Sequence, residues 1–153
     1  MRVLRSEPDQ VIGPASNPYL HRWYIIPKNR WLKIYVHKFL RSDEDRALHD
    51  HPWSFVSVML KGSYVEVTDD KRMRRSAPEP LRWFFGDRPV VFRRATWRHR
   101  VELLGHGWAQ SETPCWTLII TGPHVRNWGF WCPGWPGERF VPWRQWGPGG
   151  CES

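Results

Sequence analysis

The chain has 153 residues, a formal net charge of +8 at neutral pH and 12 tryptophans. This length allows one domain that buries its own core without disulfides or a structural metal. No apolar run approaches the roughly 20 residues that a membrane-spanning helix needs, and the N-terminus lacks the apolar segment of a signal peptide. We therefore expect a cytoplasmic protein that does not bind membranes.

The three cysteines, Cys115, Cys132 and Cys151, are widely spaced and odd in number. None of them forms the C-x-x-C pair that is typical of zinc sites or redox motifs. We expect all three to be free thiols in a reducing compartment.

The positive charge favours anionic partners, because a positive field raises their local concentration. Basic residues gather in 69–75 and 92–100, the second run containing a tryptophan and a phenylalanine. Arginines beside aromatic rings are typical of nucleic-acid surfaces, so nucleic-acid binding is an open alternative. A solvated basic surface explains the same runs equally well.

The predicted elements begin after residues 1–18, which mix proline, glycine and polar residues without a period and indicate an irregular arm that wraps the domain. Residues 30–40 alternate between apolar and polar side chains, as a strand does. Residues 49–60 and 63–69 do the same on either side of Lys61 and Gly62, and together they predict a hairpin.

Further strand-like runs occupy residues 81–104 and 115–121, and glycine, proline and tryptophan punctuate the chain from residue 123 onward. No segment has a long apolar stripe of helical period. Short strands separated by turns predict one all-β domain, a sandwich or small barrel, over residues 19–145, followed by a frayed tail at 146–153.

A cluster of histidines is the strongest chemical signal. His49 and His51 are two residues apart, so in an extended segment both side chains point to one face. His99, at the start of a later strand, is the best third ligand, whereas His37 and His106 are weaker candidates and His124 follows Pro123 in a predicted turn. Neutral imidazoles bind iron, zinc, copper and nickel, so the type of ligand does not identify the metal. The alternative is a pair of surface or hydrogen-bonded histidines.

The histidine pattern resembles the two sequence motifs of the cupin superfamily. His49, His51 and Gly62 match the first motif, whereas its glutamate position falls on Phe55. The second motif, Pro-x-Gly-x-x-His, matches only at its last residue, His99. The resemblance implies a cupin-type double-stranded β-helix, which is a jelly-roll barrel, and it implies a homodimer.

Within that superfamily, the H-D-H at 49–51 and the H-R-V-E at 99–102 are similar to cysteine dioxygenase and related thiol dioxygenases. These proteins hold iron with three histidines and no carboxylate. The resemblance therefore implies Fe(II) bound by His49, His51 and His99, with zinc, manganese or nickel as alternatives. The family's arginine for the substrate carboxylate would fall on Ile26, which leaves the substrate unassigned. Residues 120–135 also resemble uncharacterised bacterial and phage cupins, which supply no activity.

The remaining candidate residues follow from strand alternation. Those with the parity of the histidine pair are expected to line a substrate cavity: Trp53, Phe55 and Ser57. On the preceding strand, Tyr35 and His37 are candidates to act in catalysis or to orient a ligand, and Lys33 shares their parity as an anion-binding candidate. Ordinary barrel packing, or solvent exposure for Lys33, is the competing interpretation.

Glu102 lies three residues after His99, where it either orients a ligand histidine or pairs with a neighbouring arginine. The second role is the more common one.

These observations favour a metal-binding cupin, a non-haem iron oxygenase that acts on a small, anionic molecule. One alternative is a non-oxidative isomerase or epimerase for a sugar or sugar nucleotide, with a histidine as base. The other is a non-catalytic cupin that binds a ligand or nucleic acid.

Overall fold

Short antiparallel strands form nearly all the regular structure of the computed structural model, which describes residues 5–43, 47–78, 88–106, 111–134, 136–147 and 149–152. Two short 3-10 helices, η2 (Trp143–Gln145) and η3 (Gly150–Glu152), lie near the C-terminus. None of the helices in these residues is long and apolar enough to cross a membrane.

The first sheet has six antiparallel strands. In spatial order these are β1 (Gln10–Ile12), β2 (Leu20–Tyr24), β3 (Lys33–Phe39), β12 (Cys115–Thr121), β5 (Phe55–Lys61) and β8 (Val90–Arg93). The side chains that point inward along β3, β12 and β5 form one wall of the interior.

The second sheet is assembled from two three-stranded pieces. One piece is β7 (Arg72–Ser76), β6 (Ser63–Val67) and β9 (Arg100–Leu103), and the other is β14 (Arg139–Pro142), β13 (Gly129–Cys132) and β4 (Leu48–His49). A β-bridge between His49 and His99 joins β4 to the start of β9. A separate pair, β10 (Gly105–His106) and β11 (Ser111–Glu112), completes the strands.

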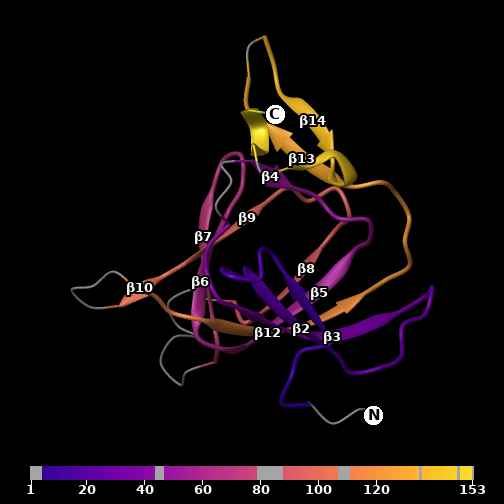
Figure 1. The fold of residues 1–153 in the computed structure, drawn as a ribbon, viewed down its shortest axis with the longest axis vertical. Coiled ribbons are helices and arrows are strands. Elements are labelled where there is room, and N and C mark those ends of the chain that lie inside the picture. Colours follow the sequence, from indigo (N-terminus) through magenta and orange to yellow (C-terminus); the bar gives the residue numbers. More distant parts are fainter. Residues whose placement is uncertain are drawn as a thin grey trace.

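The strand order gives two four-stranded sheets, β3-β12-β5-β8 and β4-β9-β6-β7, with β1-β2 and β13-β14 added at their edges (Figure 1). Eight antiparallel strands in this arrangement form a jelly roll. The predicted all-β class and the jelly-roll architecture are therefore confirmed.

The predicted hairpin about Gly62 is wrong, although both of its strands exist. β5 pairs with β12 and β8, whereas β6 pairs with β7 and β9. Gly62 has a φ of 78°, and a Cβ added there would lie 3.1 Å from the Cβ of Cys115. Glycine is suited to this backbone conformation, and it occupies the point where the chain leaves one sheet for the other.

The N-terminal arm is more regular than expected. Residues Gln10–Ile12 form β1, which pairs with β2. The backbone oxygen of Arg5 accepts a hydrogen bond from Trp23 Nε1 at 3.0 Å. Pairing with an edge strand gives this irregular sequence the regular hydrogen bonds that its composition did not predict.

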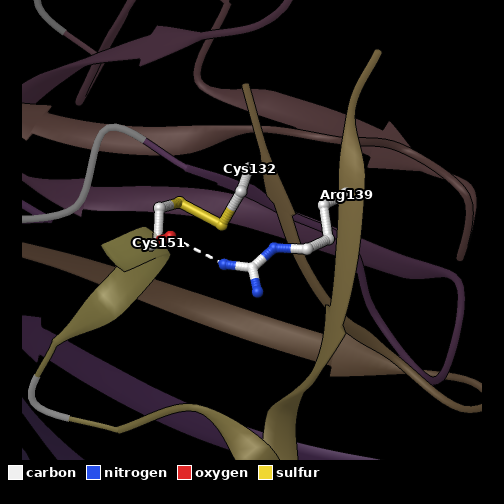
Figure 2. Close-up of a disulfide and its surroundings, with 3 residues drawn as sticks. All are labelled: Cys132, Arg139 and Cys151. Carbon is white, nitrogen blue, oxygen red and sulfur yellow. Dashed lines mark hydrogen bonds between the residues drawn. A yellow bond between two sulfur atoms is a disulfide. The ribbon is translucent and has the colours of Figure 1, made fainter. Parts of the chain in front are cut away.

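The cysteine prediction is also wrong. Cys132 and Cys151 form a disulfide, and Arg139 Nη2 donates a 2.7 Å hydrogen bond to the backbone oxygen of Cys151 (Figure 2). Residues 149–152 are therefore attached to β13 and β14 rather than frayed, and the cysteines no longer support a reducing compartment. Cys115 is free, and burial raises the pKa of its thiol to about 12.

Candidate metal centre and cavity

The three predicted metal ligands come together. His49 ends β4, His51 follows two residues later, and His99 immediately precedes β9. One nitrogen of each ring lies within 4.8 Å of the others. Nε2 of His51 and Nε2 of His99 are 2.9 Å apart.

Backbone pairing brings these distant residues together. His49 and His99 exchange both backbone hydrogen bonds, at 2.9 and 3.0 Å, and His51 N donates to the backbone oxygen of Ala95 at 3.1 Å. Directly opposed residues of an antiparallel pair present their side chains on the same face. The two backbone segments therefore place three imidazoles around one point.

The nitrogen spacing fits a shared metal ion. Two nitrogens that each bind an ion at about 2.1 Å lie about 3 Å apart when they subtend a right angle. The 2.9 Å between His51 and His99 agrees with that separation. Imidazole donors accept several first-row metals, so the site is compatible with a metal ion without fixing its identity.

The environment keeps two of these ligands, His49 and His51, neutral. Burial lowers the pKa of His49 to about 4, against the opposing influence of Asp43. Burial and the neighbouring imidazoles lower the pKa of His51 well below its usual value. Metal ligands must be deprotonated, so both rings are ready to bind at neutral pH.

A buried carboxylate that the sequence reasoning missed lies behind the third ligand. Glu66, on β6, is 1% exposed, and its Oε1 lies 2.9 Å from His99 Nδ1. The sequence did contain a signal for its burial, because Glu66 has the same parity as Tyr64 in the alternating segment 63–67 and should therefore point to the same face of the strand. Hydrogen bonds from Arg93 and His99 outweigh burial and hold the pKa of Glu66 far below its usual range.

The aspartate of the H-D-H segment has a different role. Asp50 is 1% exposed and accepts hydrogen bonds from Gly129 N at 2.9 Å, Arg126 Nη1 at 2.5 Å and Trp131 Nε1 at 3.1 Å. Alternation turns its side chain away from the histidines. Asp50 therefore anchors the segment around β13 to the segment that carries the metal ligands.

The histidines line a cavity of about 630 Å³ between the two sheets. Five of the residues predicted by alternation line the same cavity: Tyr35, His37, Trp53, Phe55 and Ser57. The C-terminal part of the chain adds an aromatic wall in which Trp146 stacks on Phe130 at 3.8 Å between ring centroids.

Lys33 occupies a different position from the other predicted residues. Its Nζ lies 4.1 Å from the ring centroid of Trp53, and it does not belong to the lining of the cavity. Partial burial lowers the pKa of Lys33. The lysine packs on a residue of the cavity wall rather than pointing into the cavity.

A second cation, absent from the predicted site residues, does line the cavity. Arg22, on β2, donates from Nε to His37 Nε2 at 2.8 Å, and its guanidinium lies 4.6 Å from the centroid of the Tyr35 ring. Among the described residues no carboxylate forms an ion pair with Arg22. Arg22 and Arg41 both belong to the described lining, and Arg22, beside Tyr35 and His37, can offer its guanidinium to an anionic ligand.

Burial determines the protonation state of the two candidate catalytic residues. His37 Nε2 accepts the arginine hydrogen bond, and burial together with the charge of Arg22 lowers its pKa well below the usual value. Burial raises the pKa of Tyr35 to about 12. At neutral pH His37 is therefore a neutral acceptor and Tyr35 is a protonated donor.

One buried hydroxyl in the wall has no partner. Thr117, on β12 opposite His37, is 1% exposed and lines the cavity, and its Oγ1 has no hydrogen-bond partner among the described residues. Buried hydroxyls are normally paired. A polar group of a ligand is a suitable partner for Thr117.

The basic runs of the sequence are largely neutralised within the chain. Arg98 bridges Asp69 at 2.8 Å and Glu138 at 2.6 Å, and Glu102 pairs with Arg72 and Arg100. Glu102 thus pairs with arginines and is not a histidine partner. His124 lies beside Trp53, outside the histidine cluster; the side chain of His106 lies outside the described residues.

Comparison with known proteins supports the fold. No family model and no curated protein sequence matches the chain. An RmlC-like cupin from Ralstonia eutropha is 15% identical over 88% of this chain and 73% of its own, with a TM-score of 0.52. A double-stranded β-helix protein from Klebsiella pneumoniae is 12% identical over 85% of this chain and 96% of its own, with a TM-score of 0.53.

The EutQ protein of Clostridium difficile is 9% identical over 81% of this chain and 82% of its own, with a TM-score of 0.50. At these identities the likeness concerns the backbone architecture alone. The chain has the double-stranded β-helix fold of the cupin superfamily, and three histidines in its cavity can hold a metal ion.

Proposed function

We propose that this protein is a metal-dependent cupin enzyme, a non-haem iron oxygenase that acts on a small, anionic organic molecule. The observation that carries the proposal is the convergence of three imidazoles, without a carboxylate in the ligand set, on the wall of a cavity. Three neutral ligands leave the +2 charge of the ion uncompensated, which favours an anionic substrate. Ferrous iron, when bound, supplies the chemistry of oxygen activation.

The chain's own residues would bind and orient the substrate. Arg22 offers a guanidinium to a carboxylate or another anionic group, and the unpaired hydroxyl of Thr117 offers a further hydrogen bond from the same wall. Tyr35 keeps its proton at neutral pH and can donate it in a hydrogen bond. Phe55, near His51, helps to exclude water from the metal side of the cavity.

The cavity limits the size of the substrate. Its volume of about 630 Å³ lies within the range of roughly 300–1,000 Å³ that is usual for sites of small molecules. The lining combines aromatic rings with a few polar groups, which suits an organic acid with an apolar body. The pairing of Arg72, Arg98 and Arg100 within the chain gives nucleic-acid binding less support.

Metal analysis of untagged protein tests the proposal. We expect near-stoichiometric iron in the wild type and after anaerobic reconstitution, and its loss in His49→Ala, His51→Ala and His99→Ala. His124→Ala, which changes a histidine outside the cluster, is the matched control. The iron-loaded protein should then consume oxygen with one of a panel of small organic acids and thiols.

Two outcomes would contradict the proposal that the protein is an oxygenase. One is a wild type that binds no metal after reconstitution with iron, zinc, manganese and nickel. The other is a metal-loaded protein that consumes no oxygen and instead interconverts sugars or sugar nucleotides, which would favour the isomerase.

A further inference from the structure

The buried carboxylate of Glu66 is held by donors on every side. Its Oε1 accepts from Arg93 Nε at 2.8 Å and from Trp97 Nε1 at 2.9 Å, and it lies 2.9 Å from His99 Nδ1. Its Oε2 accepts from Arg75 Nε at 3.0 Å, Arg75 Nη2 at 2.9 Å and Arg93 Nη2 at 2.5 Å. Strands β7 and β8 and the loop before β9 thus direct their donors to a single side chain on β6.

The two arginines determine what this carboxylate can do. Arg75 is buried beside it and the side chain of Arg93 is 11% exposed, and the two guanidinium groups that form ion pairs with this carboxylate keep it ionised. An ionised carboxylate only accepts hydrogen bonds. The hydrogen between Glu66 and His99 must therefore belong to Nδ1 of the histidine.

Placing the proton on Nδ1 of His99 also determines the state of the other ring nitrogen, Nε2. A neutral imidazole protonated on Nδ1 has its lone pair on Nε2, and this is the atom of His99 that lies 2.9 Å from His51 Nε2. Both oxygens of Glu66 are fully engaged, so the carboxylate stays outside the ligand set instead of approaching the ion. The result is a metal site with three neutral ligands, one of which has a fixed orientation.

We propose that Glu66, clamped by Arg75 and Arg93, is a positioning residue that fixes His99 in its Nδ1–H tautomer and thereby completes the metal site. The proposal rests on the three-histidine site of the proposed function but not on its reaction. Partners of this kind, which act through a ligand histidine, typically change metal affinity about 10–100-fold when they are removed.

The variant Glu66→Gln tests this role, with Glu102→Gln as the matched control. Glu102 also pairs with two arginines and lies on β9, but it does not contact the histidines. We expect Glu66→Gln to bind Co(II) and Zn(II) about 10–100-fold more weakly in chelator competition, and to change the visible spectrum of bound Co(II). Glu102→Gln should have the metal affinity and the Co(II) spectrum of the wild type. Circular dichroism should show that the two variants are folded.

Nitrogen NMR of the imidazoles in the metal-free wild type provides a test that needs no variant. We expect His99 to carry its proton on Nδ1 at neutral pH. A proton on Nε2, or a folded Glu66→Gln protein with unchanged metal affinity and unchanged Co(II) spectrum, would overturn the proposal. A protein that binds metal but consumes no oxygen would refute the oxygenase alone, whereas a wild type that binds no divalent metal would refute both.

Discussion

Nε2 of His51 and Nε2 of His99 lie 2.9 Å apart, although 48 residues separate them in the chain. Two lone pairs at this distance repel each other unless a proton or a metal ion lies between them. We therefore expect a divalent metal at about 100 times its dissociation constant to stabilise the protein by about 2.7 kcal/mol. Differential scanning fluorimetry should show a rise in Tm of roughly 5–10 °C. His51→Ala should lose this rise, and an equal rise in that variant would place the metal elsewhere.

Arg22 is predicted to select anionic ligands. Arg22→Met removes the guanidinium but retains much of the apolar stem, and a lost charge-assisted hydrogen bond costs about 1.5–3 kcal/mol. The affinity of the metal-loaded protein for small carboxylic acids should fall about 10–100-fold in isothermal titration calorimetry, with metal content unchanged. Arg98→Met changes an arginine outside the cavity and is the control. Equal losses in both variants would argue for a general effect of charge.

The disulfide is predicted to stabilise the C-terminal part of the cavity wall. Cys132 and Cys151 are 19 residues apart, and a loop of this size corresponds to about 3 kcal/mol of stabilisation. Cys151→Ser should lower the free energy of unfolding in urea by up to that amount. Adding dithiothreitol to the wild type should reproduce the loss, and it should have no further effect on the variant. The prediction would be contradicted if thiol counting showed that dithiothreitol had reduced the disulfide of the wild type and its free energy of unfolding had not changed.

Acid should destabilise the metal-free protein through its buried histidines. The folded pKa of His49 is about 4 against the usual 6.5, and that of His37 is also well below 6.5. Below about pH 6.5 the unfolded chain takes up protons that the folded chain does not, so stability is lost as the pH falls towards 4. The loss approaches about 1.4 kcal/mol per pH unit for each such histidine.

His37→Gln isolates one part of this pH dependence. Glutamine can still accept the hydrogen bond of Arg22 but does not titrate. Urea unfolding between pH 7 and 4 should therefore give a shallower fall in stability for the variant than for the wild type. Parallel curves would show that His37 is not held neutral by the fold.

Gly62 is predicted to be intolerant of substitution. Its φ of 78° disfavours any side chain, and a Cβ would lie 3.1 Å from the Cβ of Cys115. Gly62→Ala should lower the free energy of unfolding by roughly 1–3 kcal/mol. Gly137→Ala is the control, because a Cβ there meets no atom within 4 Å. A cost at Gly62 no larger than that at Gly137 would contradict the prediction.

Strand alternation in the sequence predicted several of the strands, although not β1, and most of the residues expected to line the cavity, although not Lys33. His49 and His51, and then Trp53, Phe55 and Ser57, share a parity in the sequence and line one cavity in the structure. The two-residue spacing likewise placed His49 and His51 on one face, whereas His99 was chosen as the third ligand from its place at the start of a later strand and from the resemblance to the cupin motifs. These features are local, because the direction of a side chain along a strand depends only on its own backbone.

Only the tertiary structure decided which segments are neighbours. It placed β5 and β6 in different sheets on either side of Gly62, joined Cys132 to Cys151, and brought Arg22 to His37. It also surrounded Glu66 with Arg75 and Arg93, residues that in the sequence belong to two ordinary basic runs. Such pairings depend on the packing of the whole chain, and local alternation carries no information about partners that are distant in sequence.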